Sequence, residues 1–214
     1  MIYFDAPMIE YGIIVSAIIP ALISYPSFLL VWSLILRLYE AERKMADKAN
    51  HDPLTLLPNR RCFDVFIDEL LKEHHNKKIS GTLFLVDIDN FKLYNDFYGH
   101  QQGDVCLQVV SQVLQRELKG LSGMIARYGG EEFIILMLNT SIEDSHRLGS
   151  RLCKAISEEN ISHKSNSPIK CVTVSVGGAY CNDLIREKYI DGLLSLADKH
   201  LYDSKSKGRN RFIM

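Results

Sequence analysis

An unbroken hydrophobic stretch lies near the N-terminus, where no charged residue occurs from residue 11 to residue 36. A helix of that length would be roughly 39 Å long at about 1.5 Å per residue, enough to cross a hydrocarbon core of about 30 Å. Arg37, Arg43 and Lys44 follow the stretch, and such positive charge collects on the cytoplasmic side of membrane proteins. We therefore expect residues 1–37 to contain a single-pass anchor in the lipid bilayer of the inner (cytoplasmic) membrane, with the rest of the chain in the cytoplasm.

Two alternatives to a membrane anchor stay open. A cleaved signal peptide would have a basic start and a shorter apolar core, and this stretch has neither. The stretch would otherwise be a hydrophobic fragment of a larger sensor.

Residues 38–51 are polar and lack glycine and proline, which predicts a helical stalk or linker. Leu38, Ala41 and Met45 recur at the spacing of a short coiled-coil seam, although an isolated solvated helix explains the pattern equally well. Pro53 should end this helix, because the residue before a proline is displaced from the α region. We therefore expect a separate domain over residues 52–214.

The rest of the chain alternates between helical and strand patterns. Apolar residues at helical spacing predict helices, whereas short apolar or alternating runs predict strands. The expected helices cover residues 58–75, 105–118, 142–156 and 190–204, with a short helical turn over 90–98; the expected strands cover 82–86, 124–126, 134–138, 171–176 and 211–214. This order predicts an α/β fold with helices packed on a central sheet.

Two of these strands should form a hairpin, because Gly129 and Gly130 stand between them and both can adopt the positive φ of a tight turn. Glu131 and Glu132 follow the turn directly. Paired carboxylates at a strand end either remain solvated or bind a hard cation, and the hairpin alone does not distinguish these cases.

A second acidic pair follows the buried strand at residues 82–86. Asp87 and Asp89 alternate with Ile88, so both carboxylates should lie on one face of the strand. Such a pair favours a bound cation over a simple exit to solvent. If this strand neighbours the hairpin, Asp87 and the hairpin acids converge at one edge of the sheet.

Composition limits the partners. The formal net charge is −1, which gives no overall bias toward polyanions, so we expect no nucleic-acid binding and only local phosphate contacts. The five cysteines are scattered and lack the spacing of a zinc site. We expect reduced thiols in a cytosolic domain.

The segment Arg127-Tyr128-Gly129-Gly130-Glu131-Glu132-Phe133 resembles the signature of the GGDEF family, the diguanylate cyclases, in its GGEEF form. Other parts of the family pattern occur in order from about residue 48 onward: Asp52 to Arg60, Asp87 to Lys92, Asn95-Asp96, Gly99-His100, Gly103-Asp104 and Lys205 to Arg211. The resemblance implies a mixed β-sheet flanked by helices, related to the polymerase palm and to nucleotide cyclases.

The resemblance also implies a metal site. Asp87 and Glu131 would bind Mg²⁺, with Mn²⁺ as an alternative, through their side chains, and Ile88 would contribute its backbone carbonyl. Glu132 would assist with the metal. Glu131 would also help deprotonate the attacking 3′-hydroxyl, and Lys92 would offset charge in the transition state.

The same resemblance assigns the GTP contacts. Asn95 and Asp104 would recognise guanine, because the carboxylate accepts from the ring N1–H and the amine, donors that adenine lacks there; His100 would lie near the ribose or base. From the residues alone, Asn95 could instead cap a turn and Asp104 a helix. Gly129 and Gly130 would lie at the phosphates.

Lys205 and Arg209 would hold the terminal phosphates, although such cations also suit the C-terminus of a helix. Arg127 would contact the product or the partner domain. Many relatives carry an inhibitory Arg-x-x-Asp product site, and the matching positions here are Gly120 and Gly123. We therefore expect no product site of that type.

These features predict a homodimeric diguanylate cyclase, paired through the catalytic domain and the stalk, that condenses two GTP molecules into cyclic di-GMP and two pyrophosphates. The alternative is a catalytically silent module that binds GTP or cyclic di-GMP. A truncated remnant of a larger receptor is a third reading.

Overall fold

The computed structural model describes residues 24–39, 50–74, 78–166, 168–184 and 190–214, in two compact units, Met1–Ala49 and Asn50–Met214. In the first unit residues 24–39 are helical, and the rings of Phe28 and Trp32 stack with centroids 6.2 Å apart. Among the described residues, no helix combines the length and hydropathy that a membrane crossing requires. Much of the expected anchor at 11–36 and of the stalk at 38–51 lies outside the described residues, so both stay predictions.

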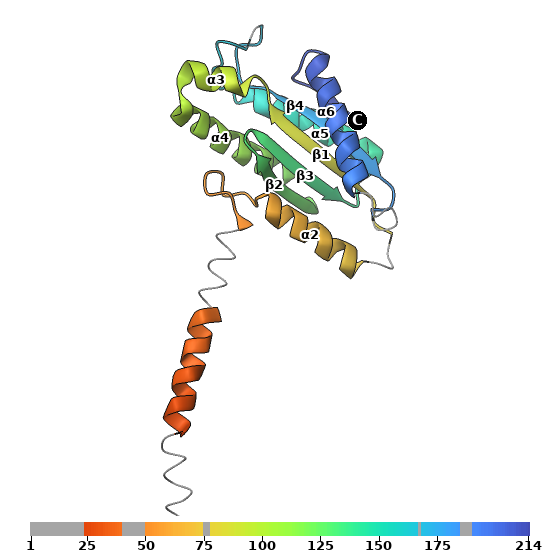
Figure 1. Ribbon diagram of the computed structural model, residues 1–214. Helices are drawn as coiled ribbons and strands as arrows, with labels where there is room; N and C mark the ends of the chain where they lie inside the picture. The colour runs from red at the N-terminus through yellow and green to blue at the C-terminus, as the bar shows by residue number, and fades with distance from the viewer. Residues whose placement is uncertain (1–23, 40–49, 75–77, 167, 185–189) are drawn as a thin grey trace, which may run out of the picture. The chain divides into compact units, whose positions relative to one another are not determined.

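The second unit is a five-stranded mixed sheet with the strand order β2-β3-β1-β4-β5 (Figure 1). Only the β4–β5 pair is parallel; the other neighbouring strands are antiparallel. The strands are β1 (Gly81–Ile88), β2 (Gly123–Gly129), β3 (Glu132–Leu138), β4 (Val174–Cys181) and β5 (Phe212–Ile213). The helices are α2 (Arg60–Glu73), α3 (Phe91–Tyr98), α4 (His100–Leu118), α5 (Ile142–Glu158) and α6 (Ile190–Ser206). The predicted α/β class with a helix-flanked mixed sheet is confirmed.

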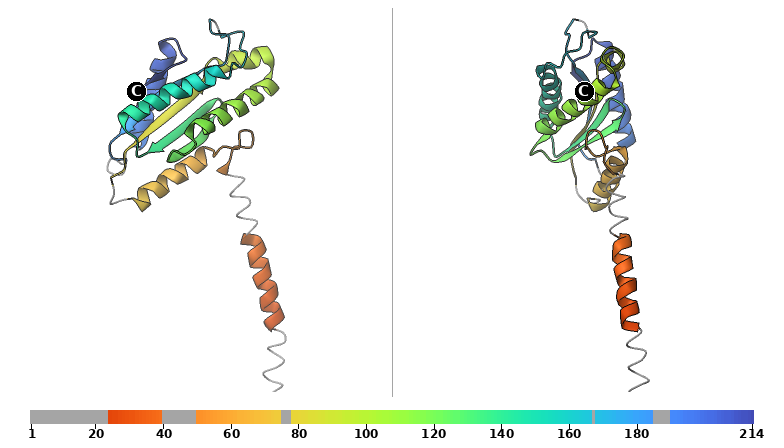
Figure 2. Two further views of the ribbon diagram at one scale, coloured as in Figure 1. Left: turned by 180° about the vertical axis from the view of Figure 1, so that it is seen from behind. Right: turned by 90° about the vertical axis from the view of Figure 1, so that its left-hand side faces the viewer.

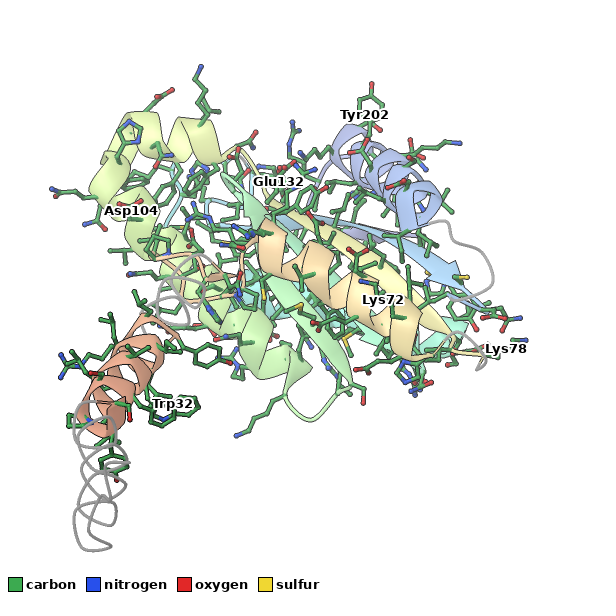
Figure 3. All side chains as sticks on the ribbon, turned by 60° about the horizontal axis from the view of Figure 1, so that its bottom comes forward. Trp32, Lys72, Lys78, Asp104, Glu132 and Tyr202 are labelled. Atoms are coloured by element: carbon green, nitrogen blue, oxygen red, sulfur yellow. The ribbon has the colours of Figure 1, made fainter. Side chains whose placement is uncertain are left out.

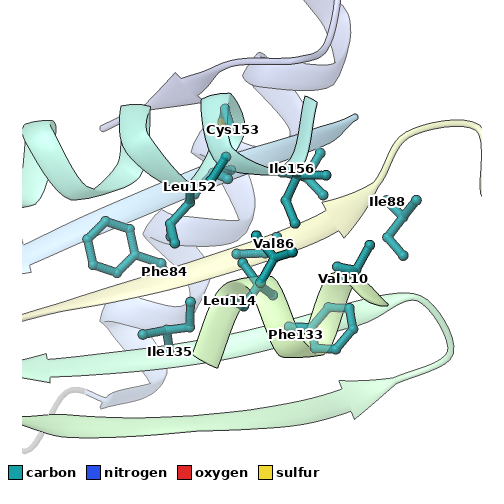
Figure 4. Packing of buried hydrophobic residues seen from close by; sticks show 14 of the residues in the cluster. Phe84, Val86, Ile88, Val110, Leu114, Phe133, Ile135, Leu152, Cys153 and Ile156 are labelled. Atoms are coloured by element: carbon teal, nitrogen blue, oxygen red, sulfur yellow. The ribbon is translucent and has the colours of Figure 1, made fainter. Parts of the chain in front are cut away.

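Helices cover both faces of this sheet. On one face α4 and α5 lie side by side, as the view from behind shows (Figure 2), and α2 and α6 cover the other face. Figure 4 shows Phe84 and Val86 of β1 among Leu114 of α4 and Leu152 and Ile156 of α5. Every residue of β1 is buried because the strand is central. A strand covered on both faces explains the continuous apolar run in the sequence.

Capping residues fix the helix starts that the sequence indicates. The Asn59 side chain accepts a hydrogen bond from the Cys62 amide at the start of α2, and Ser141 accepts one from the Asp144 amide at the start of α5. The start of α4 was expected at Val105, and it lies at His100. The first residues of α4 are mostly exposed and polar, so no apolar periodicity marks them.

The expected end of β4 at Gly177-Gly178 is wrong, because the strand continues to Cys181. These glycines serve helix packing. A Cβ atom on Gly177 would lie 2.2 Å from the Ala197 carbonyl oxygen and the Leu201 nitrogen. The missing side chain therefore lets α6 approach the sheet closely.

The hairpin forms as predicted, with one correction. Only Gly130 adopts a positive φ, of 52°. The β2–β3 register shifts between Arg127 and Gly129, so a bulge next to the turn supplies the bend that a second positive φ was expected to supply.

Candidate functional site

The two acidic segments meet at one edge of the sheet. β1 and β3 are antiparallel neighbours, and Asp87 lies directly opposite Glu132. Directly opposed residues project to the same face, and Asp87 also interacts electrostatically with Glu131. The structure therefore places Asp87 and the hairpin acids at the same end of two neighbouring strands, as the sequence predicted; a shared metal ion stays a prediction.

Lys205, at the end of α6, lies beside these acids. Its Nζ is 2.8 Å from Asp87 Oδ2, and the Asp87 side chain is only 10% exposed. The pKa of Asp87 is raised to about 6, mainly by burial. The charges of Glu131 and Glu132 raise this pKa further, whereas the hydrogen bond and the charge of Lys205 lower it. Three carboxylates thus lie near one ammonium group, that of Lys205, which leaves a deficit of positive charge at the site.

This deficit fits a hard divalent cation. The donors are carboxylate oxygens, which Mg²⁺ and Mn²⁺ accept, and the Ile88 side chain is buried in the core, so this residue could contribute only its backbone. Among the described residues, however, no three His, Cys, Asp or Glu side chains are gathered as ligands around one point. For Asp87, Glu131 and Glu132 to bind one ion together, at least one of the two glutamate side chains would have to rotate inward.

The expectation that Asp89 shares a cation with Asp87 is wrong. The Asp89 carboxylate is 1% exposed and accepts hydrogen bonds from Thr173 Oγ1 (2.7 Å), Ser175 Oγ (2.6 Å) and the Asn210 amide (3.0 Å). Three donors satisfy a buried carboxylate without a metal. Asp89 therefore joins β1, β4 and the loop after α6, a role the sequence could not show because its partners lie far away in the chain.

The residues expected to bind guanine lie around the junction of α3 and α4. Asn95 is half-buried on α3, and its Oδ1 is buried without a hydrogen-bond partner among the described residues. A Cβ atom on Gly103 would lie 1.8 Å from that oxygen, so only glycine leaves room for the Asn95 side chain. His100 and Asp104 are exposed on α4 (Figure 3, Asp104 labelled).

The capping alternative for Asp104 is wrong. α4 begins at His100, and Asp104 lies inside the helix, past its first turn. The helix shows no side-chain cap at all. Asp104 is therefore an exposed carboxylate next to Gly103, the residue that packs against Asn95. Lys92 is exposed on α3, three residues before Asn95 and on the same side of the helix.

The loop after α6 carries the other expected phosphate ligand. Arg209 is exposed, has a positive φ of 62°, and its amide donates to the Ser204 carbonyl. The next amide, that of Asn210, binds Asp89. The loop is thereby tied to β1, which places Lys205 and Arg209 at the sheet edge that carries Asp87.

Arg127 makes contacts that the sequence did not indicate, while its expected contact with the product or the partner domain stays a prediction. Its guanidinium binds within the chain, to the carboxylate of Asp52 (2.9 and 3.0 Å) and to the carbonyl oxygen of Gly130 (3.0 and 2.7 Å). Burial would raise the pKa of Asp52, but hydrogen bonds from Thr55 and Arg127 lower it below the ordinary value. The sequence reading missed Asp52 as a partner.

Comparison with known proteins agrees with this geometry. A family model described as "Diguanylate cyclase, GGDEF domain" matches residues 49–211. The chain is 36% identical over 164 residues to diguanylate cyclase DgcZ of Escherichia coli K12, covering 77% of this chain and 53% of that protein. It is 38% identical over 136 residues to diguanylate cyclase A of Treponema denticola, covering 63% of this chain and 35% of that protein. The chain thus spans about half or less of the length of these relatives.

Two further similarities extend toward the N-terminus. An uncharacterized membrane protein of Staphylococcus epidermidis, SERP0413, is 33% identical over 188 residues, covering 86% of this chain and 50% of that protein. The crystal structure of the coiled coil and GGDEF domain of DgcB from Caulobacter crescentus, in complex with c-di-GMP, superimposes with a TM-score of 0.72 at 29% identity. That match covers 84% of this chain and 93% of the DgcB chain.

Proposed function

Because the chain belongs to the GGDEF diguanylate cyclase family, we propose that it condenses two molecules of GTP into one cyclic di-GMP and two pyrophosphates. One observation carries the proposal. Asp87 lies opposite Glu132 at a sheet edge where Lys205 supplies a cation at 2.8 Å. Carboxylates that could bind a metal and a lysine that could bind phosphates thus lie close to the glycine turn, where a triphosphate would fit.

The base would lie at the junction of α3 and α4. In the part of the chain that the structure describes, Asn95 Oδ1 is buried without a hydrogen-bond partner, and Asp104 is an exposed carboxylate that follows Gly103, the neighbour of Asn95. Guanine presents the N1–H and the amine that a carboxylate and an amide can bind together. A buried polar atom without a partner is costly, which favours a ligand that satisfies it. His100 would lie at the ribose or base.

The triphosphate would lie between the glycine turn and the loop after α6. Gly129 and Gly130 have no side chains there, and no atom stands within 4 Å of where their Cβ atoms would be. Lys205 and Arg209 would bind the terminal phosphates, and Lys92 would offset charge during the reaction. Lys205 would exchange its bond to Asp87 for one to phosphate as the nucleotide binds.

Asp87, Glu131 and the Ile88 carbonyl, with Glu132 assisting, would hold the divalent ion, Mg²⁺ or Mn²⁺. The ion would supply charge neutralisation at the triphosphate. Glu131 would accept the proton of the 3′-hydroxyl, and the 3′-oxygen would attack the α-phosphate of the second nucleotide. The bond from that phosphorus to the bridging oxygen breaks, and pyrophosphate leaves; a second, equivalent attack closes the ring.

Because one site holds one nucleotide, we propose that two copies meet face to face as a homodimer. Residues 11–36 would anchor the pair in the inner membrane, with the catalytic domain in the cytoplasm, and the stalk would align the two copies. Two observations support this assembly: one relative is named a membrane protein, and the DgcB structure combines a coiled coil with a GGDEF domain.

The test is to incubate the full chain with GTP and Mg²⁺ and to measure cyclic di-GMP and pyrophosphate by mass spectrometry. We expect both products in a ratio of one to two. Glu131→Gln should lower the rate by about 10²- to 10⁴-fold, since a general base contributes that much, while the fold is retained. A dimer that binds GTP without turnover would show that the chain is a binding module instead.

A further inference from the structure

Arg127 connects two segments that are far apart in the sequence. Its Nη1 binds both carboxylate oxygens of Asp52 at 2.9 and 3.0 Å, while its Nε and Nη2 donate to the Gly130 carbonyl at 3.0 and 2.7 Å. The Arg127 and Asp52 side chains are only 16% and 18% exposed. The pair is therefore largely shielded from water and is stronger than an ordinary surface ion pair.

The Gly130 carbonyl is the part of the hairpin that this contact controls. It belongs to the same planar peptide unit as the amide of Glu131, so two donors on that oxygen fix the plane from which Glu131 departs. Gly130 has a φ of 52°, a conformation that glycine enters and leaves easily. Without an external contact, the turn would not hold its acids in one orientation.

Asp52 in turn holds Arg127. It lies in a turn formed by residues 52–57, here called the Asp52 turn, and its Oδ1 also accepts from the amide (2.8 Å) and hydroxyl (2.7 Å) of Thr55. The Arg127 amide donates to the Pro58 carbonyl at 2.8 Å. The Asp52 turn is thus fastened to β2 by side-chain bonds, and the residue that follows it, Pro58, by a backbone bond.

We propose that Arg127 is a positioning residue for the reaction: anchored by the Asp52 turn, it holds the Gly129-Gly130 turn so that Glu131 and Glu132 face Asp87. This inference rests on the proposed function.

The experiment compares Arg127→Gln, Asp52→Asn and the double variant in the full chain. Since a misplacement of about 1 Å can cost up to about 100-fold in rate, we expect kcat of Arg127→Gln to fall by about 10- to 100-fold. KM for GTP should also rise, because the turn lies at the proposed triphosphate and metal sites, but by a smaller factor than the fall in kcat, because Glu131 also acts in the transition state. Asp52→Asn should have a smaller effect in the same direction, and the double variant should be no worse than Arg127→Gln, because both act through one contact.

Hydrogen exchange separates positioning from general stability. The amides of residues 130–132 should exchange faster in Arg127→Gln, while those of β1 and β4 stay protected. Arg151→Gln is the matched control: it removes the ion pair with Glu117 Oε2 at 3.0 Å, far from the hairpin along the chain, and should leave kcat unchanged. If Arg127→Gln does not fold, Asp52→Asn and the conservative Arg127→Lys carry the test, with partial activity expected of the lysine.

The outcomes distinguish this inference from the proposed function. No product from the wild-type chain would refute the function itself. An active wild type with Arg127→Gln and Asp52→Asn both at full kcat would refute the positioning role alone, as would a loss of kcat in Arg127→Gln that Arg151→Gln reproduces.

Discussion

Replacing Asp87 by asparagine should make the metal-free protein more stable above pH 6 while removing the proposed activity. The carboxylate is 10% exposed, and its pKa is raised from 3.8 to about 6, mainly by burial. Each pKa unit corresponds to about 1.4 kcal/mol, so the ionised group costs on the order of 3 kcal/mol in the folded state. A neutral amide of the same shape avoids that cost.

The pH dependence gives the sign. Because the folded-state pKa of Asp87 is raised, its stabilising contribution is fully present below about pH 3.8 and is lost as the pH rises through about 6. The difference between Asp87→Asn and the wild type should therefore be small near pH 4 and approach about 3 kcal/mol near pH 8. Urea unfolding in metal-free buffer at both pH values measures it.

Asp89→Asn is the matched control on the same strand. Its carboxylate accepts three hydrogen bonds, and an amide nitrogen cannot accept. This substitution should destabilise the protein by about 1–3 kcal/mol for each donor left without a partner. If Asp87→Asn is instead less stable than the wild type at pH 8 without metal, the account of a charge-deficient site is refuted.

Three further predictions concern other positions. In steady-state kinetics, Gly103→Ala should raise KM for GTP by about 2- to 10-fold, the value of one hydrogen bond, with less effect on kcat. The reason is that the new methyl group displaces Asn95 Oδ1. An unchanged KM would show that Asn95 does not take part in base recognition. Leu56→Gly should stabilise the protein by about 1 kcal/mol in urea unfolding, because a left-handed conformation costs non-glycine residues about 1–2 kcal/mol. Leu56 has a φ of 59° and its side chain is 74% exposed, so little packing is lost. A lower unfolding midpoint would contradict this. Added cyclic di-GMP should not reduce the initial rate through positions 120 and 123, because Gly120 and Gly123 offer no side chain; strong inhibition that does not compete with GTP would reveal a product site elsewhere.

Local features explain what the sequence could predict. The apolar runs depend on neighbouring residues, so they located most of the elements; the structure adds the Asn59 and Ser141 caps at two of the helix starts. The expected convergence of Asp87 with the hairpin acids depended on one assumption, that their strands are neighbours. The β1–β3 pairing confirms that assumption.

Contacts between distant segments explain what the sequence could not predict. Asp87 and Asp89 look equivalent in the sequence, and only their partners, Lys205 for one and the donors from β4 and Asn210 for the other, separate their roles. The bond between Asp52 and Arg127 spans 75 positions. No local pattern indicates it, although both residues lie within the family motifs.

The longest of these bonds has a consequence for the cell. Asp89 and the Asn210 amide are separated by 121 positions, and contacts of such separation form slowly because a large loop must close first. The loop after α6, which carries the proposed phosphate ligand Arg209, should therefore reach the end of β1 late in folding. Partly folded or locally opened copies would lack this ligand, so they would not carry out the proposed reaction.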